Sequence, residues 1–360
     1  MRLTRRSLAL AAPAIGLAAL PAFADSKTPG ADWERVSLQQ AGLKPEAIEA
    51  LELQLCALPT TAFMIVSGGR VSYTYGDIAQ TCYLASARKS ILSMLFGKYV
   101  AAGKINLDAT MADLGIDDVQ PLLPIEKTAK VRDLLIASSG VYHPAGSPGA
   151  DDNVPPRGSH QPGTHFHYNN WDFNVLGAVF EKTTGKTVFA AMAEDLAKPL
   201  GFQDFDLKRQ RMMGFADQSR YLAYHIFLSA RDMARLGVAM LRNGNWNGQQ
   251  VVPADWVKES TRMRVPASGV GRGGLGYSYL WWIPEDRKTA PWAGAYLASG
   301  QFGQYILVLP AIDTVIVHRR AVTDEYAVQR NLGKTKFEPT RVLNGDFLKL
   351  ADAIVAARTA

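Results

Sequence analysis

The stretch Ser86-Ala87-Arg88-Lys89, which opens the largely apolar run Ser90–Phe96, places a serine and a lysine three positions apart at the start of an expected helix. In a helix, side chains at this spacing lie on one face, about one turn apart. An unprotonated lysine amine there can take the serine proton and make the hydroxyl a nucleophile. The helix N-terminus adds its positive dipole end and a free N–H group for an oxyanion. The alternative is a serine that caps the helix beside a surface lysine, so the interpretation depends on partners elsewhere.

The segment Tyr168-Asn169-Asn170 supplies the first candidate partners of the serine. A phenol beside an ammonium group has its pKa lowered, so Tyr168 alone or a Tyr168–Lys89 pair can act as a general base. The amide of Asn170 could bind Lys89 or a substrate carbonyl. The position of this segment, after a loop rich in Gly and Pro and before an expected helix, favours a functional role.

The segment Tyr296–Gln304 is a candidate second donor to the oxyanion. Gly300 and Gly303 lie beside an expected strand, where glycine lets the backbone approach a ligand closely. A β-bulge without a ligand is the alternative interpretation of these glycines.

Two hairpins near the two ends of the chain predict the sheet. The β-rich runs Ala62–Ser67 and Arg70–Tyr75 are joined by Gly68-Gly69, and the runs Gln304–Leu309 and Thr314–His318 are joined by a short turn. Helices are expected within Pro45–Leu53, Thr128–Leu135, Asp172–Gly177, Ser229–Leu236 and Phe347–Val355. Strands near both termini with helices between them predict one sheet that carries an inserted, mainly helical region.

This pattern predicts the domain organisation. Residues 25–85 and 270–360 are expected to form an α/β sheet domain, residues 86–269 a mainly helical region, and the catalytic cleft to lie between them. The long aperiodic loop from 143 to 167 lies in the helical region, and such loops are more often functional than incidental.

Residues 1–24 have the features of a twin-arginine export signal. Thr4–Leu10 carries the arginine pair, an apolar run continues to Leu20, and Ala22-Phe23-Ala24 resembles a cleavage site. A periplasmic or secreted protein is therefore expected, with a retained anchor as the alternative. Removal of this segment takes away three arginines and no acid, so the net charge falls from +6 to +3. A charge this small indicates neither nucleic acid nor an anionic membrane as a partner.

Cysteines, histidines and motifs limit the other chemistries. Cys56 and Cys82 could form one disulfide in an oxidising compartment or remain two buried thiols. His160, His165 and His167 lack the spacing of a zinc site, and no metal or organic cofactor is expected. No Gly-x-Ser-x-Gly motif is present, which argues against an α/β-hydrolase. The adjacent Trp281 and Trp282 are expected in the core or in a cleft wall.

Taken in order along the chain, these elements resemble the serine β-lactamase and penicillin-binding-protein superfamily. The likeness is greater to the branch of class C β-lactamases, carboxylesterases and 6-aminohexanoate-dimer hydrolases, and it covers nearly all of the chain after residue 24. It rests on Ser86-x-x-Lys89, Val131–Leu135 with Ser138–Gly140, Tyr168-x-Asn170 with Phe173–Gly177, Ser229–Arg235 with Asn243–Gly248, and Pro253–Trp256. The resemblance implies an α+β, β-lactamase/transpeptidase-like fold, with helices flanking an antiparallel sheet built from both termini.

The resemblance also implies roles for individual residues. Ser86 is expected to be the acylated nucleophile and Lys89 the amine that activates it. Tyr168 is expected to be the base for acylation and the proton donor to the leaving group. Asn170 is implied as a polar contact near Lys89 and the substrate. The backbone N–H groups of Ser86 and Gln301 are implied as the oxyanion hole.

One motif departs from the family pattern and bears on the substrate. The family carries Lys-Thr-Gly or His-x-Gly where this chain has Ala298-Ser299-Gly300, so the cation that helps hold the carboxylate of penicillins and D-Ala-D-Ala peptides is missing. We therefore expect a serine hydrolase that acts on a small-molecule ester or simple amide. A β-lactamase or D-Ala-D-Ala peptidase, and a non-catalytic binding module on the same scaffold, are the alternatives.

Overall fold

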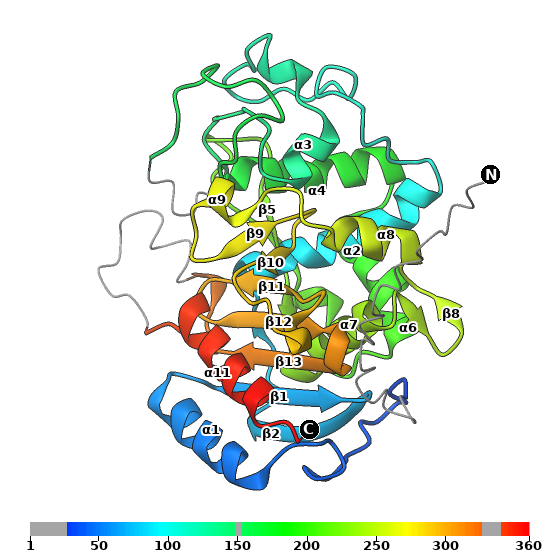
Figure 1. Cartoon of the computed structure of the whole chain (residues 1–360). Coiled ribbons are helices and arrows are strands. Elements are labelled where there is room, and N and C mark those ends of the chain that lie inside the picture. Colours follow the sequence, from blue (N-terminus) through cyan, green and yellow to red (C-terminus); the bar gives the residue numbers. More distant parts are fainter. Residues whose placement is uncertain (1–26, 148–152, 326–339, 360) are drawn as a thin grey trace, which may run out of the picture.

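A computed structural model describes residues 27–147, 153–325 and 340–359, so the expected export signal lies outside the described residues (Figure 1). Its main feature is one antiparallel sheet of seven strands in the order β2-β1-β13-β12-β11-β10-β9. In chain order these strands are β1 (Ala62–Ser67), β2 (Arg70–Gly76), β9 (Leu275–Tyr277), β10 (Trp282–Pro284), β11 (Tyr296–Gly300), β12 (Gln304–Leu309) and β13 (Thr314–Arg319).

Both predicted hairpins are present in this sheet. Gly68 and Gly69, between β1 and β2, have φ values of 59° and 77°, which a tight hairpin turn requires of its two central residues. β12 and β13 are joined by a turn in which Asp313 has a φ of 47°. β1 pairs with β13 over their whole lengths, with Ile65 opposite Ile316. This pairing confirms that the two ends of the chain build one sheet.

Helices cover both faces of the sheet. α11 (Asn344–Ala356) packs with α1 (Pro45–Ala57), and its Phe347 ring stacks on Tyr305 of β12 at a centroid distance of 4.3 Å. α7 (Ala230–Leu241) packs against β12 and β13, and Gly237 keeps it close: a Cβ there would lie 3.0 Å from Ile306 and 2.5 Å from Val315. Because neighbouring strand residues point to opposite faces, Tyr305 and Ile306 place α11 and α7 on opposite sides.

The remaining elements lie above and beside the sheet in Figure 1. The helices are α2 (Arg88–Ala101), α3 (Val131–Leu135), α4 (Asn170–Thr184), α5 (Val188–Ala191), α6 (Lys198–Leu200), α8 (Ala254–Thr261) and α9 (Ala267–Val270). Short antiparallel pairs join β3 (Cys82–Tyr83) to β6 (Phe227–Leu228), β4 (Arg211–Met213) to β5 (Ala223–His225), and β7 (Asn245–Trp246) to β8 (Gln249–Gln250). α2 contacts β11 of the sheet as well as α4 and α8, and so joins the sheet to the other helices.

The expected α+β architecture is therefore present, with one difference in which helix covers the sheet. α7 lies within the range predicted for the inserted helical region, yet it packs directly on the central strands. Helical periodicity identifies such a helix but does not say which surface its apolar face contacts. The domain boundaries themselves stay a prediction.

The cysteines are both free thiols in the structure. Cys82 is buried in β3, as expected of a thiol that packs as a small hydrophobe, whereas Cys56 is exposed on α1. The two cysteines are therefore neither joined in a disulfide nor both buried. Among the helices that the structure describes, none is long and apolar enough to cross a membrane.

A buried histidine in β13 makes the stability of this fold depend on pH. The His318 ring has no exposed surface, and its two nitrogens lie 2.7 Å from the Gly303 carbonyl oxygen and 3.0 Å from the Thr60 hydroxyl. Burial lowers its pKa from 6.5 to about 4. Between these values the unfolded chain binds more protons than the folded protein, so stability is fully present above pH 6.5 and falls as the pH drops towards 4.

We predict that His318→Gln removes this contribution to the pH dependence. Wild type should lose about 2 kcal/mol more unfolding free energy than the variant between pH 7 and pH 5, because only wild type carries the lowered pKa of His318. Urea denaturation of both proteins at the two pH values measures the difference. An equal loss in both proteins would contradict the assignment.

Candidate active site

Ser86 lies in η1 (Ala85–Ala87), a 3-10 turn that runs directly into α2. Tyr83 pairs with Phe227, and the Leu84 N–H donates to Ile226, so the residues just before Ser86 are held by β6 and its neighbour. Ala85 has a φ of 47°, an uncommon left-handed conformation for a residue other than glycine. The N-cap of α2 is Ala87, without a side-chain hydrogen bond. Ser86 is therefore not the helix cap that the alternative interpretation required.

Lys89 brings the candidate polar residues together. Its side chain is 1% exposed, and Nζ donates to Ser86 Oγ at 3.1 Å, Tyr168 Oη at 2.8 Å and Asn170 Oδ1 at 2.7 Å. The same nitrogen lies 4.0 Å from the centroid of the Phe173 ring. A single buried amine thus links residues from η1 and α4 and places the Ser86 hydroxyl beside a group that can exchange a proton with it.

The cap of α4 explains why Tyr168 and Asn170 converge on this amine. Asn169 is the N-cap residue, and its Oδ1 accepts from the Trp171 N–H at 2.9 Å. Its Nδ2 donates to the Val141 carbonyl at 2.6 Å, which fixes the cap against the preceding loop. Tyr168 and Asn170 flank this fixed residue, so both side chains are held at the start of α4.

The structure corrects the expected pKa of Tyr168. Its ring packs between Phe173 and Trp282, at centroid distances of 4.7 and 5.4 Å. Burial raises the pKa of the phenol, and this effect outweighs the hydrogen bond with Ser86 and the positive charge of Arg88 and Arg272, which lower it. The prediction of a lowered pKa is therefore wrong. The phenol keeps its proton at neutral pH and is suited to donate it.

Gly300 places the end of β11 against η1. A Cβ at this position would lie 2.9 Å from the Ala87 nitrogen and closer still to the Leu84 oxygen, so only glycine fits without displacing the backbone. β11 and β12 pair in continuous register from Tyr296 to Gly300, which does not match the β-bulge alternative. Gln301, the next residue, therefore lies at the same cleft as Ser86.

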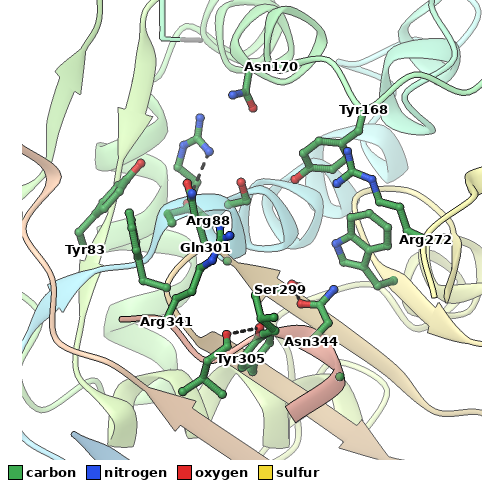
Figure 2. Close-up of a pocket in the computed structure, with 18 of the residues that line it drawn as sticks. Tyr83, Arg88, Tyr168, Asn170, Arg272, Ser299, Gln301, Tyr305, Arg341 and Asn344 are labelled. Carbon is green, nitrogen blue, oxygen red and sulfur yellow. Dashed lines mark hydrogen bonds between the residues drawn. The ribbon is translucent and has the colours of Figure 1, made fainter. Parts of the chain in front are cut away.

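A cleft of about 470 Å³ opens over these residues (Figure 2). Ser86, Tyr168, Asn170, Gly300 and Gln301 all line it, whereas Lys89 lies beneath its surface. Trp282 also lines the cleft and Trp281 is buried in the core, which confirms the expectation for this pair.

Sequence reasoning missed the cations of the cleft. Arg88, Arg272 and Arg341 line it, and none of the described lining residues is Asp or Glu. Arg88 is buried, where its guanidinium donates to Asn174 Oδ1 at 3.3 Å. Arg272 and Arg341 are exposed, and the Arg272 guanidinium lies 5.0 Å from the Tyr168 ring centroid. The available signal was Arg272 within the glycine-rich stretch 271–274.

A second missed feature is the hydrogen-bonded chain behind Tyr83, which lines the cleft. Tyr83 Oη lies 3.2 Å from His225 Nε2, and His225 Nδ1 lies 3.0 Å from Asp324 Oδ2. Arg211 binds the same carboxylate, and these contacts hold the pKa of Asp324 well below its usual range. An ionised Asp324 accepts a hydrogen bond from His225 Nδ1–H, so Nε2 accepts a hydrogen bond from the Tyr83 hydroxyl. These hydrogen bonds, from Asp324 through His225, hold the Tyr83 side chain at the edge of the cleft.

The histidines of the long loop form no metal site in the described structure. The rings of His160 and His165 stack at a centroid distance of 4.0 Å, and His160 Nδ1 lies 3.0 Å from the Tyr142 hydroxyl. Within the residues described, no group of three or more His, Cys, Asp or Glu side chains is arranged to hold a metal ion.

Known structures share this fold at low sequence identity. A putative 6-aminohexanoate-dimer hydrolase from Bacillus anthracis is 18% identical, with a TM-score of 0.64 over 92% of this chain and 89% of that chain. A penicillin-binding protein from Bacillus halodurans is 16% identical, with a TM-score of 0.57 over 79% of this chain and 99% of that one. EstCE1, a hydrolase with promiscuous acyltransferase activity, is 17% identical, with a TM-score of 0.56 over 80% and 97% of the two chains.

Sequence comparison gives the family. An uncharacterized protein of Alkalihalophilus pseudofirmus is 22% identical over 256 residues, which are 65% of this chain and 72% of that protein. The family model described as Beta-lactamase matches residues 48–321, a range that holds Ser86, Lys89 and Tyr168 as well as the whole central sheet. Together with the fold, this match shows that the chain belongs to the Beta-lactamase family, within the serine β-lactamase and penicillin-binding-protein superfamily.

Proposed function

We propose that this chain is an exported serine hydrolase that forms an acyl-enzyme at Ser86 and acts on an ester or a simple amide. The observation that carries the proposal is the Lys89 amine, whose Nζ lies 3.1 Å from Ser86 Oγ and 2.8 Å from Tyr168 Oη. Export rests on the twin-arginine pattern within residues 1–24.

In the proposed acylation, the unprotonated Lys89 amine takes the proton of Ser86 as Oγ attacks the carbonyl carbon. The carbonyl oxygen becomes an oxyanion, which the backbone N–H groups of Ser86 and Gln301 stabilise. Tyr168 donates its proton to the leaving oxygen or nitrogen, whose bond to carbon then breaks, and Lys89 returns a proton to the tyrosinate. Water then attacks the acyl-enzyme, and its proton passes back through the same groups to Ser86.

Two observations favour an ester or a simple amide. Ala298 stands where the family carries a cation, and the neighbouring Ser299, whose hydroxyl donates to Asn344 Oδ1 at 2.9 Å, adds no charge. Among the proteins of similar fold, one is described as a hydrolase with promiscuous acyltransferase activity and another as a putative 6-aminohexanoate-dimer hydrolase. The second candidate function, β-lactam or peptide hydrolysis, lacks comparable support, because the segment Ala298-Ser299-Gly300 carries no cation.

We predict that Ser86→Ala abolishes hydrolysis of p-nitrophenyl butyrate, because the proposed acyl-enzyme forms on the Ser86 oxygen that this variant lacks. Steady-state release of p-nitrophenol, with Ser268→Ala as the matched control, measures this effect. Ser268 is an exposed serine of α9 that does not line the cleft, so its variant should keep wild-type turnover. Undiminished turnover in Ser86→Ala would refute the proposal.

Tyr168→Phe tests the assignment of Tyr168 as the acid for the leaving group. We expect kcat for an ethyl ester to fall about 10²–10⁴-fold, because ethoxide needs a proton as it leaves. The decrease for the matching p-nitrophenyl ester should be much smaller, because p-nitrophenolate leaves without one. Kinetics on both esters, with Tyr75→Phe on β2 as a control, measure the difference. An equal decrease for both leaving groups would indicate a merely structural role.

Gly300→Ala tests the close approach of β11 to η1. The new Cβ has to displace the backbone of Leu84 or Ala87, so we expect a stability loss of about 1–3 kcal/mol and a lower kcat. Gly345→Ala is the matched control: this glycine lines the same cleft, and its Cβ would meet nothing within 4 Å. Thermal denaturation and ester kinetics give the two quantities. Wild-type values in Gly300→Ala would contradict the oxyanion geometry.

A further inference from the structure

The charge of the described cleft lining is strongly one-sided. Its described lining holds three arginines, Arg88, Arg272 and Arg341, and neither Asp nor Glu. Asn344 and Gly345, also in the lining, are the first residues of α11, so the positive end of this helix faces the same space. A neutral ester gains nothing from such an arrangement, whereas an anionic substrate is attracted by it.

Arg88 contributes to this field but is not placed to bind a substrate. Its side chain is 3% exposed, donates to Asn174 and the Ala85 carbonyl, and lies 4.8 Å from the centroid of the Tyr224 ring. Its positive charge opposes, without cancelling, the rise that burial causes in the pKa of Tyr168. Arg88 therefore acts from beneath the cleft floor.

Arg272 and Arg341 differ from Arg88 in exposure and in position. Figure 2 shows Arg272 entering the pocket beside Tyr168, and Arg341 on the side of Gln301 and Tyr305. Both residues are exposed, and neither forms an ion pair with a carboxylate in the described part of the chain. By contrast, several other partly buried arginines each bind a carboxylate of the protein itself: Arg157, Arg231, Arg242 and Arg287. The two cleft arginines thus keep their donors for another anion.

We propose that Arg272 and Arg341 bind a carboxylate of the substrate, so that the acyl donor of Ser86 is an anionic ester or amide; this rests on the proposed function. The planar guanidinium group donates two parallel hydrogen bonds to a carboxylate, which gives orientation as well as affinity. The segment Ala298-Ser299-Gly300 lacks the cation that the family carries there. In the proposed site these two arginines supply positive charge from other segments, one just before β9 and one just before α11. They are specificity-determining residues, whereas Ser86, Lys89 and Tyr168 carry out the bond exchange.

The test uses two matched pairs of esters and the full-length protein. The first pair, para-acetoxybenzoate and its methyl ester, differs by a carboxylate on the leaving group. The second pair, mono-p-nitrophenyl adipate and its methyl diester, differs by a carboxylate on the acyl group. We expect kcat/KM to be at least about 10-fold higher for the anionic member of one pair, and this preference to shrink at high salt.

Variants assign the preference to the two arginines. Arg272→Gln and Arg341→Gln should each lower kcat/KM for the preferred anionic ester about 10-fold and change that of its neutral partner less than about 2-fold. The neutral ester also reports that each variant is folded. Arg272→Lys should retain part of the preference, because the charge remains while the paired donors are lost. Arg220→Gln, at an exposed arginine outside the cleft, should leave both rates unchanged.

The outcomes separate this inference from the function on which it rests. Equal kcat/KM within both pairs, or a preference that persists in the Arg272→Gln/Arg341→Gln double variant, overturns the carboxylate site while Ser86-dependent hydrolysis of neutral esters stands. Hydrolysis that does not depend on Ser86 overturns the proposed function itself. A preference for one anionic ester that the two single variants remove supports the inference and identifies which side of the scissile bond carries the carboxylate.

Discussion

The position of one buried amine governs the site. Lys89 Nζ is enclosed by Tyr168 and Phe173, and it donates to Ser86, Tyr168 and Asn170. Polar neighbours are needed at this depth: an ammonium group can donate to all three, whereas the neutral amine keeps two donors and a lone pair that can accept the Ser86 proton. The packing of α2 against α4 meets that need and at the same time places a serine hydroxyl beside a proton acceptor. Structural and chemical requirements are thus met by the same contacts.

The sheet supplies the rigid frame for this contact. β1 and β13 join the two ends of the chain, α7 and α11 cover the two faces, and β11 ends against η1 at Gly300. The close approach at Gly300 fixes the distance between the sheet and the turn that carries Ser86. The start of α11 forms another part of the cleft through Asn344, whose side chain binds Ser299. The cleft is therefore assembled from segments throughout the chain, each held by backbone packing.

The sequence predicts what depends on local spacing. Ser86 and Lys89 are three positions apart, the Gly68-Gly69 turn adopts the φ values that its hairpin needs, and Tyr168 and Asn170 flank the cap of α4. Each of these follows from residues within one turn or one helix end. Their meeting around Lys89 is not local: the chemistry of Tyr168 and Asn170 makes them candidate partners, and the family resemblance implies the same roles.

What the sequence could not predict depends on burial and long-range packing. The pKa of Tyr168 rises because of the rings around it, so the effect of a neighbouring charge gives the wrong direction. Arg272 and Arg341 occupy segments without a recognisable motif, and only the fold brings them to one cleft. The environments of the two free thiols likewise depend on the fold, which exposes Cys56 on α1 and buries Cys82 in β3.

The proposed acyl transfer requires a covalent bond to one oxygen atom, that of the Ser86 hydroxyl. Intact-protein and peptide mass spectrometry after brief exposure to a fluorophosphonate probe measures whether that bond forms and where. We predict one adduct per chain, located on Ser86, in wild type and no adduct in Lys89→Ala at the same exposure, because the hydroxyl is then no longer activated. An unlabelled wild-type protein, or equal labelling of both proteins at Ser86, would contradict the central role of the Lys89 amine.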